Sequence, residues 1–206
     1  MKPDKASGPD NTNVNILQKC LDLDIPLSII FNSSLQTSYI PQDWRDSNVT
    51  PIHKKGSRQK CNNYRPVSLT SQIAKLMERL VLDQLSALVK ANGTISCHQH
   101  GFQSGCSCTT QLIECLRYWI DNLDKGLETD AIYLDFSKAF DTVPHIRLIH
   151  KSKQAGVRGK VLSWIEGFLS GRRQRVQIRG GTSSWQDVKV ASPKEVSWVL
   201  FSSSYI

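Results

Sequence analysis

Apolar side chains recur at intervals of three and four residues in six segments, which predicts amphipathic helices. The longest follows Thr70 or Ser71, either of which can cap a helix, and stops at Asn92 and Gly93. Its apolar face is formed by Ile73, Leu76, Met77, Leu80, Val81, Leu85 and Leu88. The other helices are expected from Asn13, from Pro26, over residues 112–123, over residues 144–154 and over residues 160–170.

Two pairs of short segments have the alternation and composition of strands. Asn48–Ile52 and Tyr64–Leu69 flank a basic loop, and Arg175–Arg179 and Trp185–Val190 flank Gly180 and Gly181. Each pair predicts a β-hairpin. Helices interspersed with short strands indicate an α/β (α+β) fold, and 206 residues suffice for one good core.

The chain is organised around residues 131–145, AIYLDFSKAFDTVPH. Ala131–Leu134 has the composition of a buried strand and ends at the carboxylate of Asp135, and a second carboxylate follows at Asp141. A buried carboxylate is costly unless it meets a cation or a donor. On these residues alone two interpretations remain open, because both acids can cap the segments that follow them or bind a metal.

Positive charge is concentrated in two clusters, His53–Lys60 and Gly171–Arg175. The net charge is +8 and the isoelectric point is about 9.3. Such clusters suit a polyanionic partner, and they are also typical of nuclear-import signals.

Cysteine usage and the N-terminal residues indicate a reducing compartment. The chain has six cysteines, but its N-terminus has no apolar segment of a signal peptide. We therefore expect an intracellular protein, nuclear or cytoplasmic and not secreted, with no disulfide framework and no membrane span. Cys97, His98, His100, Cys106 and Cys108 form a cluster whose spacing fits no usual zinc finger, so free thiols are the simpler interpretation.

The segment LDFSKAFDTVPH, at Leu134–His145, resembles the first catalytic motif of reverse transcriptases from non-LTR retrotransposons, in the long interspersed element, jockey and CR1-like groups. Further similar blocks are KASGPD (5–10), IPQDWRDSNVTPIHKKG (40–56), NNYRPVSLTS (62–71), HQHGFQSG (98–105), GVRGKVLSWIEGFLSGRRQRV (156–176) and GGTSSWQDVKV (180–190). They stand in the family's order and spacing, so the resemblance covers nearly all of residues 5–190.

The resemblance implies a partial right hand, with mostly helical fingers and a β-hairpin leading into an incomplete palm sheet. Residues 1–12 would be an extended lead-in, residues 13–130 the fingers region, and residues 131–190 the first part of the palm. The implied activity is RNA-directed DNA polymerisation, with an RNA template, a DNA primer and deoxynucleoside triphosphates as partners.

The resemblance also assigns roles to individual residues. Asp135 would be the catalytic carboxylate, and with the backbone carbonyl of Phe136 it would bind Mg²⁺ in a two-metal site. Phe140 would lie beneath the sugar of the nucleotide. Lys54, Lys55 and Arg65 would bind its phosphates, and Arg172, Arg173 and Arg175 would contact nucleic acid. The family usually has arginine where this sequence has Gln103, which removes one phosphate ligand.

The remaining metal ligands of the family are an adjacent acidic pair, and this sequence contains no adjacent acidic residues. The codons of Trp198 and Val199 are TGG and GTN, and read in another frame they contain the glycine codon GGT. The family has a glycine at this point, within its SVLGPVLF block. We interpret residues 191–206 as a frameshifted, non-native tail that begins near Lys194. We therefore expect no polymerisation by this polypeptide. A non-catalytic RNA- or DNA-binding remnant and an unstable pseudogene product are the alternatives.

Overall fold

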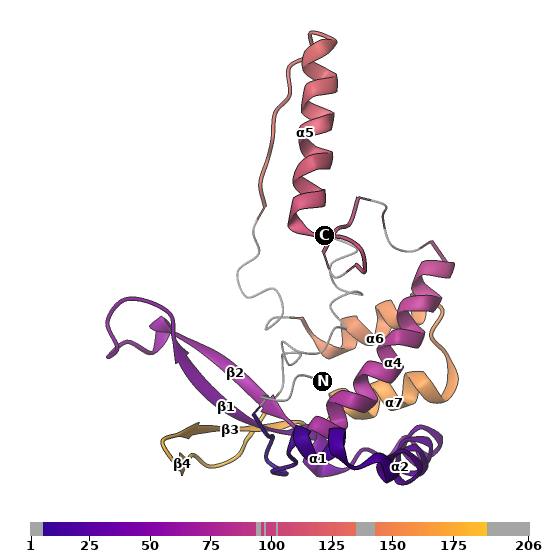
Figure 1. The fold of residues 1–206 in the computed structure, drawn as a ribbon, viewed down its shortest axis with the longest axis vertical. Helices are drawn as coiled ribbons and strands as arrows, with labels where there is room; N and C mark the ends of the chain where they lie inside the picture. Colours follow the sequence, from indigo (N-terminus) through magenta and orange to yellow (C-terminus); the bar gives the residue numbers. More distant parts are fainter. Residues whose placement is uncertain (1–5, 94–95, 97, 102, 135–142, 189–206) are drawn as a thin grey trace.

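The computed structural model describes residues 6–93, 96, 98–101, 103–134 and 143–188. In this part of the chain, a group of packed helices carries a long β-ribbon on one side and a helix, α5, that stands away from the rest (Figure 1). The helices are α1 (Val14–Lys19), α2 (Asp24–Thr37), α3 (Gln42–Arg45), α4 (Gln72–Ala91), α5 (Cys108–Asp124), α6 (His145–Gln154) and α7 (Gly159–Leu169). All but α3 are expected from the apolar periodicity, and these six confirm that prediction.

Helix α4 begins where its sequence indicates, at the cap residue Ser71. The Ser71 hydroxyl accepts a hydrogen bond from the backbone N–H of Ala74 at 3.3 Å and donates one to the Asp10 carboxylate at 2.7 Å. The N-terminal segment lies directly against this cap, since a Cβ on Gly8 would come within 2.6 Å of the backbone of Thr70. The lead-in is therefore fastened to the start of α4.

The core lies between α2, α4, α6 and α7. Trp164 and Phe168 of α7 are fully buried and stack with ring centroids 5.1 Å apart. The indole N–H of Trp164 donates to the hydroxyl of Ser34 on α2 at 2.9 Å, which satisfies the one polar atom of the ring. The same core includes Phe31, Ile40, Trp44, Met77, Val81, Leu82, Leu85, Val89, Leu148, Ile165 and Leu169.

The sheet joins the two predicted hairpins. Its strands are β1 (Asp46–His53), β2 (Tyr64–Thr70), β3 (Arg173–Ile178), β4 (Gly181–Thr182) and β5 (Gln186–Asp187). The order is β2-β1-β3-β4, and β5 also pairs with β3. β1 is antiparallel to β2 and parallel to β3, so the sheet brings together residues more than 120 positions apart in sequence. The helices and the mixed sheet confirm the α+β class and fit a partial right hand.

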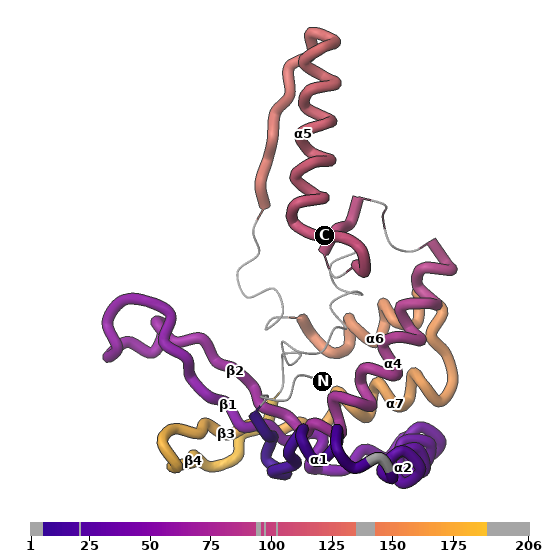
Figure 2. Tube along the Cα trace, in the orientation of Figure 1, coloured from indigo at the N-terminus to yellow at the C-terminus, as the bar shows by residue number. Residues whose placement is uncertain are grey.

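The prediction of a buried strand at residues 131–134 is wrong. These residues form no strand, and Ile132, Tyr133 and Leu134 are 85%, 82% and 78% exposed. An extended segment needs hydrogen-bonded neighbours to become a strand, and within the described residues this segment pairs with none. The chain continues from the end of α5 into this segment in an extended conformation (Figure 2).

Helix α5 has the amphipathic pattern that the sequence predicts, but none of its residues is buried. Leu112, Leu116 and Leu123 are 62%, 50% and 74% exposed. Among the described residues, no helix is long and apolar enough to cross a membrane.

Candidate nucleic-acid interface

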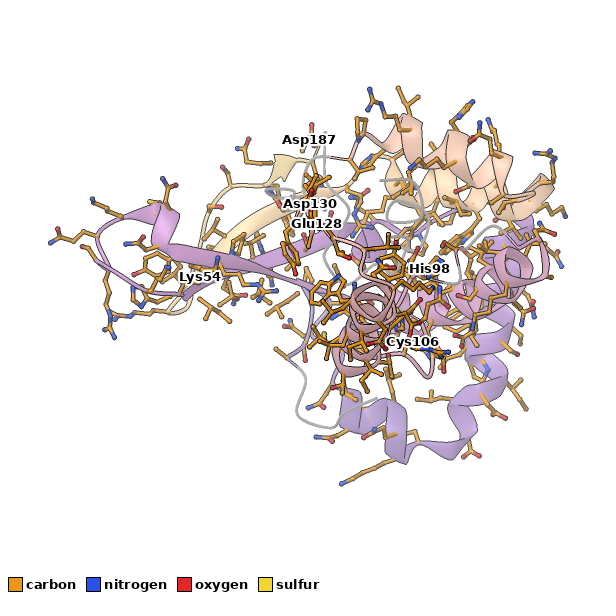
Figure 3. The ribbon with its side chains drawn as sticks, turned by 90° about the horizontal axis from the view of Figure 1, so that it is seen from above. Lys54, His98, Cys106, Glu128, Asp130 and Asp187 are labelled. Carbon is orange, nitrogen blue, oxygen red and sulfur yellow. The ribbon has the colours of Figure 1, made fainter. Side chains whose placement is uncertain are left out.

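The loop that joins β1 to β2 has a defined shape that presents two lysines. The backbone N–H of Lys54 donates to the carbonyl of Asn63 at 2.8 Å, and the Asn63 side chain donates to the carbonyl of Ser57 at 2.7 Å. Gly56 has φ of +79°, a conformation that favours glycine. The side chains of Lys54 and Lys55 are exposed, and Figure 3 shows Lys54 on the projecting ribbon.

Arg65 lies on β2, opposite Ile52 of β1, and is exposed. Because side chains alternate between the two faces of a strand, Arg65, Ile52 and Lys54 belong to one face of the ribbon. The structure thus brings Lys54 and Arg65, two of the three predicted phosphate ligands, to one face, with Lys55 next to them in the loop.

The three arginines predicted to contact nucleic acid have three different environments. Arg172 is only 3% exposed, and its guanidinium lies 4.8 Å from the ring centroid of Phe168 and donates to the Phe168 carbonyl at 3.4 Å. Burial lowers the pKa of Arg172, partly offset by the nearby Glu78. In this structure Arg172 is a core residue and does not face solvent, so the prediction of a surface contact is corrected.

Arg173 is held by a carboxylate. Its Nε and Nη2 donate to the two oxygens of Asp46 at 3.0 and 2.6 Å, and this bidentate hydrogen bonding raises the pKa of Arg173. Asp46 is buried, and it also accepts a hydrogen bond from Gln42 at 2.7 Å. The positive charge of Arg173 is therefore largely neutralised within the protein.

Arg175 is placed by a neutral partner. Its Nε donates to the side-chain oxygen of Asn48 at 2.8 Å, and its guanidinium lies 4.5 Å from the ring centroid of Trp185. Arg173 approaches the same ring, at 5.2 Å. Arg175 is half-buried, and its hydrogen bond to Asn48 uses only one of its five N–H groups.

Trp185 lies on the same face of the sheet as Arg175, and the sequence analysis did not predict this position. The pairs Ile178–Gly181 and Gln177–Thr182 set one register, but Gln174 pairs with Gln186, so the returning strand contains one extra residue. One inserted residue moves the following side chains to the opposite face. A regular hairpin would place Trp185 away from Arg175, and only the bulge brings the two together.

The predicted metal and sugar ligands Asp135, Phe136 and Phe140 lie outside the described residues. Across the described ranges, no group of three or more histidine, cysteine, aspartate or glutamate side chains is arranged to hold a metal ion.

His98 and His100 both form hydrogen bonds with the carboxylate of Glu114, His98 at 2.6 Å, and these hydrogen bonds lower the pKa of Glu114. Cys20, Cys61, Cys106, Cys108 and Cys115 are free thiols. Gln103, where the family usually has arginine, has a buried amide nitrogen without a partner.

Comparisons with known proteins agree with the resemblance seen in the sequence. The family described as "Reverse transcriptase (RNA-dependent DNA polymerase)" matches residues 52–191. The chain is 29% identical over 192 residues to "RNA-directed DNA polymerase from mobile element jockey" of Drosophila melanogaster, covering 92% of this chain and 21% of that protein. It is 28% identical over 193 residues to "Probable RNA-directed DNA polymerase from transposon BS" of the same organism, covering 92% and 21%.

The chain thus spans about a fifth of the length of the curated relatives that it matches. Members of this family act on nucleic-acid templates and primers with nucleotide substrates, and they are generally metal-dependent. With the family match extending over most of its length, this chain belongs to the reverse transcriptase family, as part of the reverse transcriptase domain of a non-LTR retrotransposon.

Proposed function

We propose that the chain forms the fingers and the beginning of the palm of an RNA-directed DNA polymerase, and that its basic hairpin binds the triphosphate of an incoming deoxynucleotide. The observation that carries this proposal is the arrangement at the end of the β1–β2 ribbon, where Lys54 and Arg65 share a face beside Lys55. Within the described residues no carboxylate pairs with these cations. The arginine supplies a planar fork and the lysines supply point charges, which together suit a polyphosphate.

We assign the metal role to Asp135 and the backbone carbonyl of Phe136, and the position beneath the sugar to Phe140. The support is the match of this segment to the first catalytic motif of the family. Mg²⁺ bound there would lower the pKa of a DNA primer's 3′ hydroxyl and neutralise the leaving pyrophosphate, on an RNA template. The residues of this chain would position the primer and the triphosphate.

A polypeptide of these 206 residues is expected to bind nucleotide without joining it to a primer. One assigned carboxylate does not hold two dications, and the sequence has no adjacent acidic pair to supply the remaining ligands. Mg²⁺-dependent nucleotide incorporation by the purified chain in a primer-extension assay would contradict this expectation.

Calorimetric titration with a deoxynucleoside triphosphate tests the binding role of the hairpin. Lys54→Ala, Lys55→Ala and Arg65→Ala should each weaken binding about tenfold, because each removes a charge-assisted contact to phosphate. Lys90→Ala removes the same charge from an exposed site at the end of α4 and should leave binding unchanged. Equal affinities for all four variants and the parent chain would show that the hairpin does not bind the triphosphate.

A second candidate function is nucleic-acid binding without catalysis. The observation that favours it is the series of cationic side chains on the sheet, from the half-buried Arg175 to the exposed Arg65 and Lys54. Arg172 is not among them because it is buried. Such binding should weaken steeply as salt rises, since each phosphate contact releases a counterion. Salt-dependent oligonucleotide binding without binding of the free triphosphate would favour this function over the first.

A further inference from the structure

One face of the sheet presents its side chains in regular rows that can be followed from the strand register. The first row holds Asp187, Arg173 and Asp46, and the second holds Trp185, Arg175 and Asn48. The third and fourth contain Gln177 with Thr50 and Ile52 with Arg65, and Lys54 follows. Acidic side chains occur only in the first row, where Arg173 lies between the two carboxylates.

Beyond that first row the described part of the face has no acidic side chain, and its cationic and polar residues lie among the apolar Leu69, Val67 and Ile52. Arg175 is anchored by Asn48, and Arg65 and Lys54 have no carboxylate partner among the described residues. Same-face residues on one strand are about 6.6 Å apart, so Arg175 and Arg65, two rows apart, are separated by about 13 Å along the strands. Cations spaced along one direction suit a chain of phosphates better than one isolated anion.

Trp185 adds a flat aromatic ring to this series of cations. The ring is half-buried against Arg173 and Arg175, and both guanidiniums are fixed by bonds to β1. A ring held in place by anchored neighbours loses little conformational freedom when a base stacks on it. Aromatic rings beside cations are the usual means of holding single-stranded nucleic acid, because every base has a stacking face and an unpaired base can reach the ring.

We propose that this sheet face binds a single-stranded stretch of nucleic acid, with one base stacked on Trp185 and the adjoining phosphates on Arg175 and Arg65. The proposal rests on the second candidate function above, in which Arg65 contacts the phosphates of a nucleic-acid strand, and it names the residue that recognises an unpaired base. Duplex nucleic acid is excluded from this contact because its bases are already stacked within the helix.

Fluorescence anisotropy with a labelled single-stranded oligonucleotide, as DNA in one series and RNA in another, tests this assignment on the whole chain. Trp185→Leu should weaken binding of both about tenfold or more, and Trp185→Phe should restore most of the affinity because it keeps a stacking face. Trp119→Leu is the matched control, since it removes a half-buried indole from α5, away from the sheet.

The dependence of affinity on salt separates stacking from charge. Trp185→Leu removes no cation and should leave the salt slope unchanged, whereas Arg175→Gln should reduce the slope by about one. Ultraviolet crosslinking offers a readout on the unaltered protein, and a base should crosslink to the tryptic peptide of residues 180–189. A single-strand preference that Trp185→Leu abolishes also supports the assignment.

The outcomes distinguish this inference from the function on which it rests. If the unaltered chain binds no oligonucleotide, both fail. If it binds with a steep salt slope but Trp185→Leu binds equally well and residues 180–189 form no crosslink, nucleic-acid binding stands and the stacking role of Trp185 is overturned.

Discussion

At the scale of single residues, Asp46 decides how much positive charge the sheet face offers. Its carboxylate is 7% exposed and holds Arg173 by two hydrogen bonds, while the neighbouring Arg175 has only the neutral Asn48. Two arginines two residues apart on one strand therefore differ in their partners: Arg173 fastens β3 to β1 through a carboxylate, whereas Arg175 meets a neutral amide.

Asp46→Asn should lower stability and strengthen oligonucleotide binding together. Loss of the charged acceptor weakens the bonds from Arg173 and Gln42 and should cost about 1–3 kcal/mol of unfolding free energy. The freed guanidinium adds a cation to the face, so the salt slope should rise by up to about one. Urea unfolding and anisotropy measure the two effects, with the exposed Asp43→Asn as control. A loss of both stability and affinity would show that Arg173 does not reach the ligand.

The contact between Glu114 of α5 and the histidines of residues 98–100 should depend on pH. Hydrogen bonds from His100 and His98 lower the pKa of Glu114 below its ordinary value of 4.5. A carboxyl group with a depressed folded pKa contributes stability above the unfolded value, and this contribution is lost as pH falls through the folded value. The contact should persist at neutral pH and open only at a pH below the ordinary value of 4.5. Carbon NMR of the Glu114 carboxyl group would detect the titration, and a midpoint at or above 4.5 would contradict it.

At the scale of elements, the sequence predicts helices and hairpins well where the determinants are local. Ser71 caps α4, Pro144 precedes α6, and both hairpins form about their loops. It fails where the determinant is another part of the chain. The periodicity of α5 indicates an apolar face but does not show which part of the chain covers it. Residues 131–134 have the composition of a buried strand but have no paired neighbour among the described residues.

The candidate site shows the same limit. The place of Lys54, Lys55 and Arg65 on one basic hairpin could be predicted, because a hairpin is formed by neighbouring segments of the chain; their role in binding phosphate stays a prediction. Arg172 could not be distinguished from its neighbours in a basic cluster, since burial depends on packing against Phe168. Trp185 joins the site through one inserted residue, and the alternation of the two strands does not reveal that insertion.

The start of α4 is an element on which the N-terminal segment depends. Ser71→Ala removes the acceptor for the N–H of Ala74 and the donor to Asp10, so it should cost about 1–2 kcal/mol of unfolding free energy. It should also make residues 6–12 more accessible to proteases. Ser33→Ala, at an exposed position of α2, should be neutral in both measurements. Unchanged protection of the N-terminal segment would show that Gly8 and its contact with Thr70 suffice to hold it.

At the scale of the whole molecule, apolar side chains lie both in the helical core and on the exposed face of α5. Trp164 and Phe168 lie fully inside the helical body, but Leu112 and Leu116 of α5 are at least half exposed. Uncovered apolar area of this kind favours association. A polypeptide of these 206 residues should therefore bind an apolar dye and self-associate as its concentration rises.

Substitution on α5 separates this surface from the core. Leu112→Gln with Leu116→Gln should reduce dye binding and association while leaving the unfolding midpoint nearly unchanged, because these side chains are already at least half exposed in the described structure. Leu85→Gln should lower stability by several kcal/mol, since Leu85 is 4% exposed and packs inside the helical body. Sedimentation and thermal unfolding distinguish the two classes. If the α5 variant loses as much stability as the core variant, the apolar face of α5 is covered in solution, and the helix then belongs to the core and does not project from it.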